Sequence, residues 1–436
     1  MSRASRRLPT GRALVIAGVG ALAIVALAPP FAAGAIVAWT LGLALAAYLD
    51  AGRARDSFEL ERRIPARVPQ GDPLDVEWTA RGRRGTARLL VAETFPETFD
   101  VESRETVMRV AADGIDRRQT EAVARRRGTW KIGPTRTRAL GPAGLGWYES
   151  TSVGPVEVRV DPSIEPLRRL SLDRRRTRLL GGHRRRLRGV GSEFESLRDY
   201  RTDDDSRWVD WKATARRRRL TSREYQVEEH QSVLFAIDTG RLMATERGDR
   251  TKLDHALGAV LAIGWAAMAR GDNLGAIAFD RTIRAELKPG RGRAQSVRFH
   301  EMLSRLQPSL QEPDWAAAFG RLGRRVHKRS LILVFTDLVD ENVSEALIDA
   351  LAHATRRHLV LVVTLTDVAL LSRVAAPPDR PADAYRNAVA ADALLLRDAA
   401  IKRLVAAGVR VVDSPADRLA ADSVEAYLRL RAENRI

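Results

Sequence analysis

The chain has 436 residues, 45% of them hydrophobic, which is enough for two or three domains with sizeable cores. The absence of cysteine excludes disulfides and thiolate metal sites. The formal net charge of +18 comes almost entirely from arginine, and it fits either the composition of a GC-rich genome or attraction to anionic lipid, nucleic acid or an acidic protein.

Two apolar runs without charged residues, 13–28 and 31–48, stand near the beginning of the chain and are separated by Pro29-Pro30. Each is close to the length that a helix needs to cross about 30 Å of hydrocarbon. We therefore predict a transmembrane helical hairpin over residues 1–50. Arginines flank both outer ends, which predicts a multi-pass protein of the cell membrane with its soluble bulk in the cytoplasm. A signal peptide cut near Ala28 is the alternative, but it leaves the second run unexplained.

Residues 53–165 contain short segments of alternating polar and apolar residues, punctuated by Gly and Pro. This pattern predicts a small antiparallel β-domain of the sandwich type. Residues 166–188 are rich in arginine and are predicted to be a solvated linker. An alternative role for the linker is binding of anionic lipid headgroups. Nucleic acid is disfavoured as a partner, since no aromatic residues interleave with these arginines.

Residues 189–230 form a block in which charges of both signs alternate with aromatic residues. We expect its carboxylates and guanidiniums to pair, and its aromatic side chains, Trp211 among them, to find apolar cover. The block is therefore interpreted as a segment that stabilises the soluble domain, here called structural glue, and that also has a binding face; it is not interpreted as an active site. The candidate binding residues are Glu193, Arg198, Tyr200, Asp204, Arg207, Asp210, Trp211 and Arg216.

Four motifs in this block occur in a fixed order: Gly-x-Gly-x-Glu-Phe at 189–194, Leu-Arg-x-Tyr at 197–200, Asp-Asp-x-Arg at 204–207 and Asp-Trp-Lys-Ala-Thr-Ala-Arg at 210–216. Together they resemble the signature of the bacterial domain-of-unknown-function family 58, membrane proteins with a von Willebrand factor A-like domain. The turn at 141–146 also resembles one of that family, with Gly141 and Ala143 in place of its Asp and Phe.

Residues 231–436 alternate between apolar strands and helices. The expected strands, 232–237, 273–279, 330–335, 358–365 and 409–412, are nearly continuous apolar runs, as in a parallel sheet covered on both faces. The fold class is therefore α/β, ending in a doubly wound domain of the von Willebrand A-like type that the resemblance implies.

Aspartates follow the first four of these strands, and a strand order of 3-2-1-4-5-6 would bring Asp238 and Asp337 together at the switch point. The resemblance implies a metal-ion-dependent adhesion site there, with Asp314 as a third member and Mg²⁺ as the expected ion. The site is degenerate, because Gly240 and Leu242 replace its two hydroxyl residues. Two alternatives remain: Arg241 replaces the cation beside Asp238, or the aspartates only cap loops and helices.

The function that we expect is a membrane-anchored scaffold or adaptor, not an enzyme, which contacts membrane lipids and binds partner proteins. The resemblance implies a MoxR-type AAA+ ATPase as the partner and a role in assembly or maturation. The alternative is a metal-dependent hydrolase that uses the aspartate cluster, although no general base is evident in the sequence.

Overall fold

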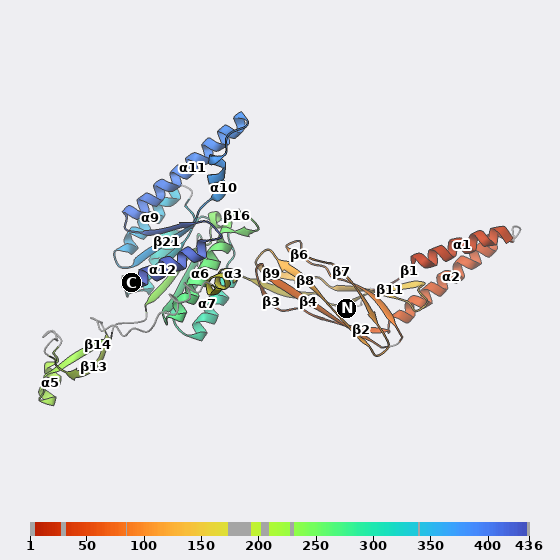
Figure 1. Cartoon of the computed structure of the whole chain (residues 1–436), viewed down its shortest axis with the longest axis horizontal. Coiled ribbons are helices and arrows are strands. Elements are labelled where there is room, and N and C mark those ends of the chain that lie inside the picture. The colour runs from red at the N-terminus through yellow and green to blue at the C-terminus, as the bar shows by residue number, and fades with distance from the viewer. Residues whose placement is uncertain are drawn as a thin grey trace. The chain divides into compact units, whose positions relative to one another are not determined.

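The computed structural model of the chain describes residues 5–27, 32–83, 85–172, 193–201, 209–226, 231–338 and 341–433. It forms two compact units, Met1–Ser163 and Ile164–Ile436. Figure 1 shows the elements of both, and each unit is considered by itself.

Two apolar helices, α1 (Gly11–Leu27) and α2 (Ala32–Ala54), lie side by side in the first unit (Figure 1). Of the described helices, α2 alone meets the length and hydropathy expected of a membrane span, and α1 is slightly shorter with 17 residues. Gly20 of α1 leaves room for the Trp39 indole of α2, since a methyl group on Gly20 would lie 2.3 Å from that ring. Most large apolar side chains of both helices are exposed, which supports a membrane location for them.

Both outer ends of this helix pair are attached to the same β-structure. The segment before α1 forms β1 (Ser5–Pro9), which pairs antiparallel with β11 (Gly146–Val153). The last turn of α2 is buried against the strands through Ala51 and Ala54. The two ends of the pair therefore emerge on the same side.

The β-structure consists mainly of a five-stranded and a four-stranded sheet that share one core. Residues from both sheets, such as Trp78 and Leu89, are fully buried in that core. The five-stranded sheet has the order β1-β11-β10-β5-β7, with β10 at Thr135–Leu140, β5 at Ala87–Ala92 and β7 at Glu105–Val110. The four-stranded sheet has the order β2-β4-β8-β6, with bounds Phe58–Arg63, Pro73–Gly82, Ile115–Ala124 and Phe99–Val101. A third sheet has the order β3-β12-β9, with bounds Arg67–Pro69, Val156–Asp161 and Gly128–Ile132.

A six-stranded sheet forms the centre of the second unit, in the order β19-β18-β15-β20-β21-β22. All pairs are parallel except β18 with β19. This matches the order 3-2-1-4-5-6 considered from the sequence once β19, which was not predicted as a strand, is counted as the third strand. The bounds are Ser232–Asp238 for β15, Asn273–Phe279 for β18, Ile283–Gly290 for β19, Leu331–Phe335 for β20, Leu359–Leu365 for β21 and Arg410–Ser414 for β22.

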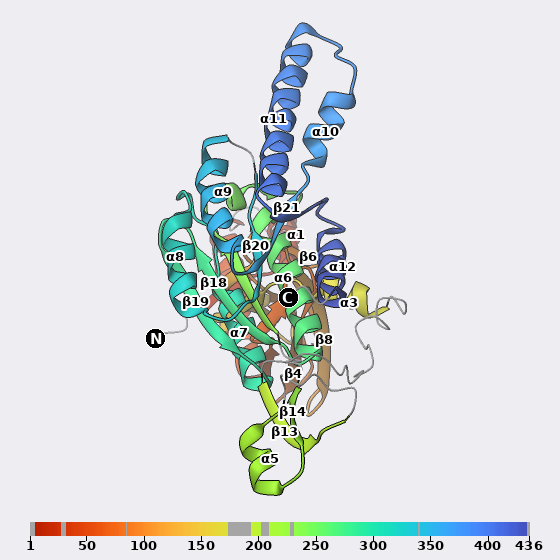
Figure 2. The same cartoon turned by 90° about the vertical axis from the view of Figure 1, so that its left-hand side faces the viewer.

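Helices cover both faces of this sheet (Figure 2). One face packs against α6 (Lys252–Ala269), α7 (Arg293–Arg305) and α12 (Leu419–Ala432). The other packs against α8 (Trp315–Arg325), α9 (Glu341–Thr355) and α11 (Pro381–Ala406). A shorter helix, α10 (Val368–Ala375), lies along the projecting part of α11 (Figure 2).

Shorter elements complete the second unit. Residues 166–172, expected to begin the linker, instead belong to helix α3 (Glu165–Leu172), and residues 173–192 lie outside the described residues. The 3-10 helix η3 (Arg241–Ala244) follows β15 and precedes the hairpin of β16 (Glu246–Arg247) and β17 (Arg250–Thr251). Within the signature block, β13 (Glu193–Asp199) pairs antiparallel with β14 (Thr221–Gln226), and helix α5 (Trp211–Arg217) lies between them in the chain.

Candidate functional site at the carboxyl edge of the six-stranded sheet

The strands β15 and β20 are neighbours, with Ile237 opposite Phe335, so the residues that follow them meet at one edge of the sheet. Asp238 ends β15, and Thr336 and Asp337 follow β20. All three side chains are buried. The structure therefore brings Asp238 and Asp337 to the switch point that the sequence indicates.

Both carboxylate oxygens of Asp238 have hydrogen-bond donors within the protein. Oδ1 accepts from the backbone N–H of Gly240 at 2.7 Å, and Oδ2 accepts from the Thr336 hydroxyl at 2.7 Å. Burial raises the pKa of Asp238 to about 6, and the negative charges of Glu312 and Asp337 act in the same direction. This carboxyl group is therefore poised to lose its charge in mildly acidic solution.

Two cations neutralise Asp337. The ammonium of Lys252, at the start of α6, contacts Oδ2, and Arg397 of α11 donates from Nη1 to Oδ1 at 2.7 Å. Burial by itself raises the pKa of Asp337, but the charges of Lys252 and Arg397 outweigh that effect and hold the pKa below its ordinary value. Burial also lowers the pKa of Lys252, although Asp337 opposes this shift.

Arg397 joins this pair to the neighbouring strands. Its Nη2 donates to the carbonyl of Leu365 at 2.7 Å and to Asp413 of β22 at 2.9 Å. The side chain is only 7% exposed, although it lies on the helix that projects farthest from the sheet (Figure 2). Arg397 thus attaches the base of α11 to the carboxyl edge.

These residues do not suit a divalent cation. Each oxygen of Asp337 already faces a positive charge, and each oxygen of Asp238 accepts a hydrogen bond. The described residues contain no group of three or more His, Cys, Asp or Glu side chains that could hold a metal ion. The geometry therefore supports internal neutralisation in place of Mg²⁺ coordination.

The residue that supplies this counter-charge differs from the expected one. Arg241 does not pair with Asp238: its Nε donates to Glu312 Oε1 at 2.7 Å, and both side chains are about half exposed. The interpretation of Arg241 as the internal counter-ion is therefore wrong. Sequence reasoning missed Lys252 because it is 85 positions from Asp337, and a lysine in the first turn of a helix usually faces solvent.

Asp314 is the N-cap of α8, where its Oδ1 accepts from the backbone N–H of Ala317 at 2.8 Å. Capping was the alternative interpretation of this residue, and no hydrogen bond or ion pair joins its carboxylate to Asp238 or Asp337 in the described part of the chain. Its backbone N–H donates to the carbonyl of Asp280 at 2.9 Å, which fixes the start of α8 beside the sheet.

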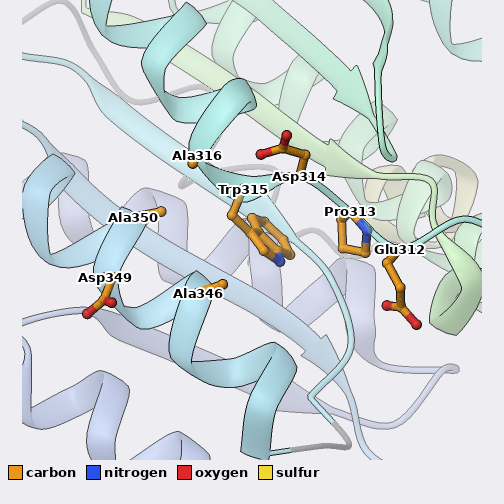
Figure 3. Close-up of a pocket in the computed structure, with 8 residues that line it drawn as sticks. All are labelled: Glu312, Pro313, Asp314, Trp315, Ala316, Ala346, Asp349 and Ala350. Atoms are coloured by element: carbon orange, nitrogen blue, oxygen red, sulfur yellow. The ribbon is translucent and has the colours of Figure 1, made fainter.

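A groove with a volume of about 630 Å³ lies between the start of α8 and helix α9. Its lining residues are Glu312–Ala316 together with Ala346, Asp349 and Ala350. Figure 3 shows the Trp315 indole at the centre of this set, with the carboxylates of Glu312, Asp314 and Asp349 around it. Trp315 is 2% exposed, and its Nε1 has no hydrogen-bond acceptor among the described residues. The groove thus combines an apolar floor, small side chains and an acidic rim.

The candidate residues of the signature block are dispersed. Asp204 and Arg207 lie outside the described residues, and nothing is described of the side chains of Glu193 and Arg198, whose backbone is in β13. Tyr200 is half-buried and Arg216 is exposed. Asp210 is the N-cap of α5 and accepts from the Ala213 N–H at 2.9 Å. Trp211 is 69% exposed, so the expectation that this side chain finds apolar cover is wrong.

Fold and site together describe a mixed α/β protein with an apolar helix of membrane-spanning length, which supports a membrane location. Residues 196–371 match the model of the family described as "Protein of unknown function DUF58". The family predicted from the signature block is therefore confirmed over this segment. No curated protein is similar enough to the chain to count as a match.

Among solved structures, an aerotolerance-related membrane protein from Bacteroides fragilis, carrying multiple mutations to serine, is 17% identical, with a TM-score of 0.25 over 31% of this chain and 66% of that one. The chain thus spans just under two thirds of that structure. The conserved hypothetical protein BatB from Bacteroides thetaiotaomicron is 15% identical, with a TM-score of 0.30 over 46% and 98% of the two chains. A CARDB domain from Pyrococcus furiosus, in complex with di-metal ions, is 9% identical, with a TM-score of 0.16 over 24% and 86%.

Proposed function

We propose that the chain is a membrane-anchored scaffold whose von Willebrand A-like α/β unit binds a partner protein at the carboxyl edge of its sheet. The observation that carries this proposal is the groove with the Trp315 floor, next to aspartates that are neutralised from within. Asp349 has no ion pair in the described part of the chain, so the acidic rim retains unbalanced charge. A basic side chain of a partner would place its methylene groups against the alanines of the groove, Ala346 among them, and its charge at this rim.

The partner that the family resemblance implies is a MoxR-type AAA+ ATPase, and the role is assembly or maturation of other proteins. The test is co-purification of the full-length chain with the MoxR-type ATPase of the same genome. Ala346→Trp fills the groove and Asp349→Arg reverses its charge, so each should reduce recovery of the ATPase about tenfold or more. Ala399→Trp, at an exposed alanine of α11, is the matched control. Unchanged recovery with both groove variants would contradict the proposal.

We further propose that α1 and α2 cross the membrane as a hairpin and that both units lie in the cytoplasm. Support comes from the attachment of both helix ends to one β-structure and from the arginines at those ends. Because the chain lacks cysteine, single cysteines report topology directly. In intact cells, a membrane-impermeant maleimide should label Ala32→Cys, at the start of α2. It should label Ser103→Cys, exposed in the β-structure, only after permeabilisation. The reverse pattern would overturn this topology.

The alternative of a metal-dependent hydrolase gains no specific support from the described residues. The aspartates on which it depends are occupied by Lys252, Arg397 and hydrogen-bond donors.

A further inference from the structure

Three arginines lie in the elements through which the helix pair joins the β-structure: Arg7 in β1, Arg12 in the first turn of α1 and Arg53 in the last turn of α2. Arg12 and Arg53 are exposed and Arg7 is half-buried. Arg12 lies against the turn at 141–146: a methyl group on Gly144 would be 3.4 Å from Nη1 of Arg12. The three residues are named here the arginine collar.

Arg7 is held in position by aromatic and backbone groups. Its Cζ lies 4.1 Å from the centroid of the Tyr48 ring, and its Nη1 donates to the Tyr48 carbonyl at 3.3 Å. Gly52 leaves space for this guanidinium, since a methyl group there would lie 3.1 Å from Nη1. The charge is therefore oriented without being neutralised.

The collar has no acidic partner among the described residues. The carboxylate of the adjacent Asp50 is 2% exposed and accepts from the backbone N–H groups of Ala143, Leu145 and Gly146. Other arginines of the same unit do have carboxylate partners, such as Arg62 with Glu93 at 2.6 Å. The collar is thus a site of unbalanced positive charge.

Exposed apolar side chains begin directly beside the collar. Leu14 and Val15 of α1 are 63% and 64% exposed, and Tyr48 and Leu49 of α2 are 55% and 51% exposed. A ligand that fits both features carries a phosphate group and long hydrocarbon chains. A soluble acidic protein would match the guanidiniums but would leave these apolar side chains uncovered.

We propose that the arginine collar binds the headgroup phosphates of anionic phospholipids, whose acyl chains lie along α1 and α2. This proposal rests on the membrane anchoring proposed above. All three arginines lie in elements at the outer ends of the helix pair, where we expect the hydrocarbon boundary, and the Tyr48 ring packs against the Arg7 guanidinium. Binding should weaken as salt concentration rises, because part of the attraction is screened.

The test uses the full-length protein in an uncharged detergent, with added phosphatidylglycerol or phosphatidylcholine of identical acyl chains. Native mass spectrometry counts the lipids that each protein molecule retains. The wild type should retain phosphatidylglycerol on the order of tenfold better than phosphatidylcholine. Arg12→Gln/Arg53→Gln should lose most of this preference, and Arg7→Gln should lose part of it. The control Arg104→Gln/Arg136→Gln removes the same charge from exposed positions elsewhere in the β-structure and should keep the preference.

Equal retention of the two lipids by the wild type would overturn the proposal. The proposal would also be overturned if the control variant lost its preference for phosphatidylglycerol as strongly as the collar variants do. Competition by glycerol 1-phosphate at the same concentration as the lipid would mean a free-phosphate site and would also overturn it. A separate carbonate wash of native membranes tests the anchor: release of the chain contradicts the membrane scaffold itself. If the chain stays in the membrane during the wash but shows no preference for phosphatidylglycerol, only the proposed lipid site at the arginine collar is contradicted.

Discussion

The carboxylate of Asp50 accepts a hydrogen bond from the backbone N–H of Gly146, with Oδ2 3.1 Å from the nitrogen. Asp50 belongs to the apolar helix α2, and Gly146 begins β11, so this bond joins the proposed membrane anchor to the soluble β-structure. The two backbones approach so closely that a methyl group on Gly146 would lie 2.2 Å from the carbonyl oxygen of Ala47. Position 146 therefore requires glycine, because any larger residue would overlap with the backbone of α2.

Replacement of Gly146 by alanine should consequently separate α2 from β11. We expect Gly146→Ala to reduce the free energy of unfolding of the first unit by about 2–3 kcal/mol, because the backbone must move to relieve the overlap. Thermal denaturation of the full-length protein in detergent measures the loss. Gly154→Ala is the control, since a methyl group there meets no atom within 4 Å. Equal melting temperatures for the two variants would mean that the helix is not fixed at this point.

Local pattern explains what could be predicted from the sequence. Four of the central strands are nearly continuous apolar runs with an aspartate at or just after their ends, so their type and the meeting of Asp238 with Asp337 followed from the sequence. Strand β19 was missed because its exposed residues include charges and a Pro-Gly pair, as is common at a sheet edge. Lys252 and Arg397 were missed because their contacts with Asp337 span 85 and 60 positions, and no local pattern encodes such contacts.

Removal of the charge of Asp337 should be costly. Asp337→Asn leaves Lys252 and Arg397 buried with too little negative charge, and we expect a loss of about 3–5 kcal/mol in the free energy of unfolding of the second unit. Asp398→Asn removes one partner of an exposed ion pair with Lys402, so its effect should stay below about 1 kcal/mol. Chemical denaturation compares the two. A similar small loss in both variants would show that the charge of Asp337 contributes little to the free energy of unfolding.

The stability that Asp238 contributes should depend on pH. Its pKa is raised to about 6 in the folded state, against about 3.9 in an unfolded chain. Between these values the folded state holds a proton that the unfolded state has lost, so this group's contribution to stability falls as pH rises through that window. Asp238→Asn cannot ionise. Its melting temperature relative to the wild type should therefore rise from pH 4 to pH 6 and then level off. A difference in melting temperature that does not change between pH 4 and pH 6 would contradict this expectation.

Trp211 and Trp315 provide a matched comparison of an exposed and a buried indole. Trp211 is 69% exposed, so Trp211→Ala should change the free energy of unfolding by no more than about 0.5 kcal/mol. Trp315 is 2% exposed and packs edge-on against Phe279 with ring centroids 5.1 Å apart, so Trp315→Ala should cost about 3–5 kcal/mol. A large loss with Trp211→Ala would restore the interpretation of the signature block as structural glue.

Lys252 should decide whether the carboxyl edge can bind a cation. Its ammonium faces Asp337 Oδ2, so isothermal titration of the wild type with Mg²⁺ or Mn²⁺ should give no heat of binding. Lys252→Ala frees this oxygen and leaves Arg397 as the remaining counter-charge, so weak affinity in the millimolar range should appear. The added substitution Asp337→Ala should abolish it, and circular dichroism should show that each variant is folded. Mg²⁺ binding by the wild type that is lost in Asp337→Ala would show that a cation displaces Lys252. That outcome would return the metal-dependent hydrolase to consideration.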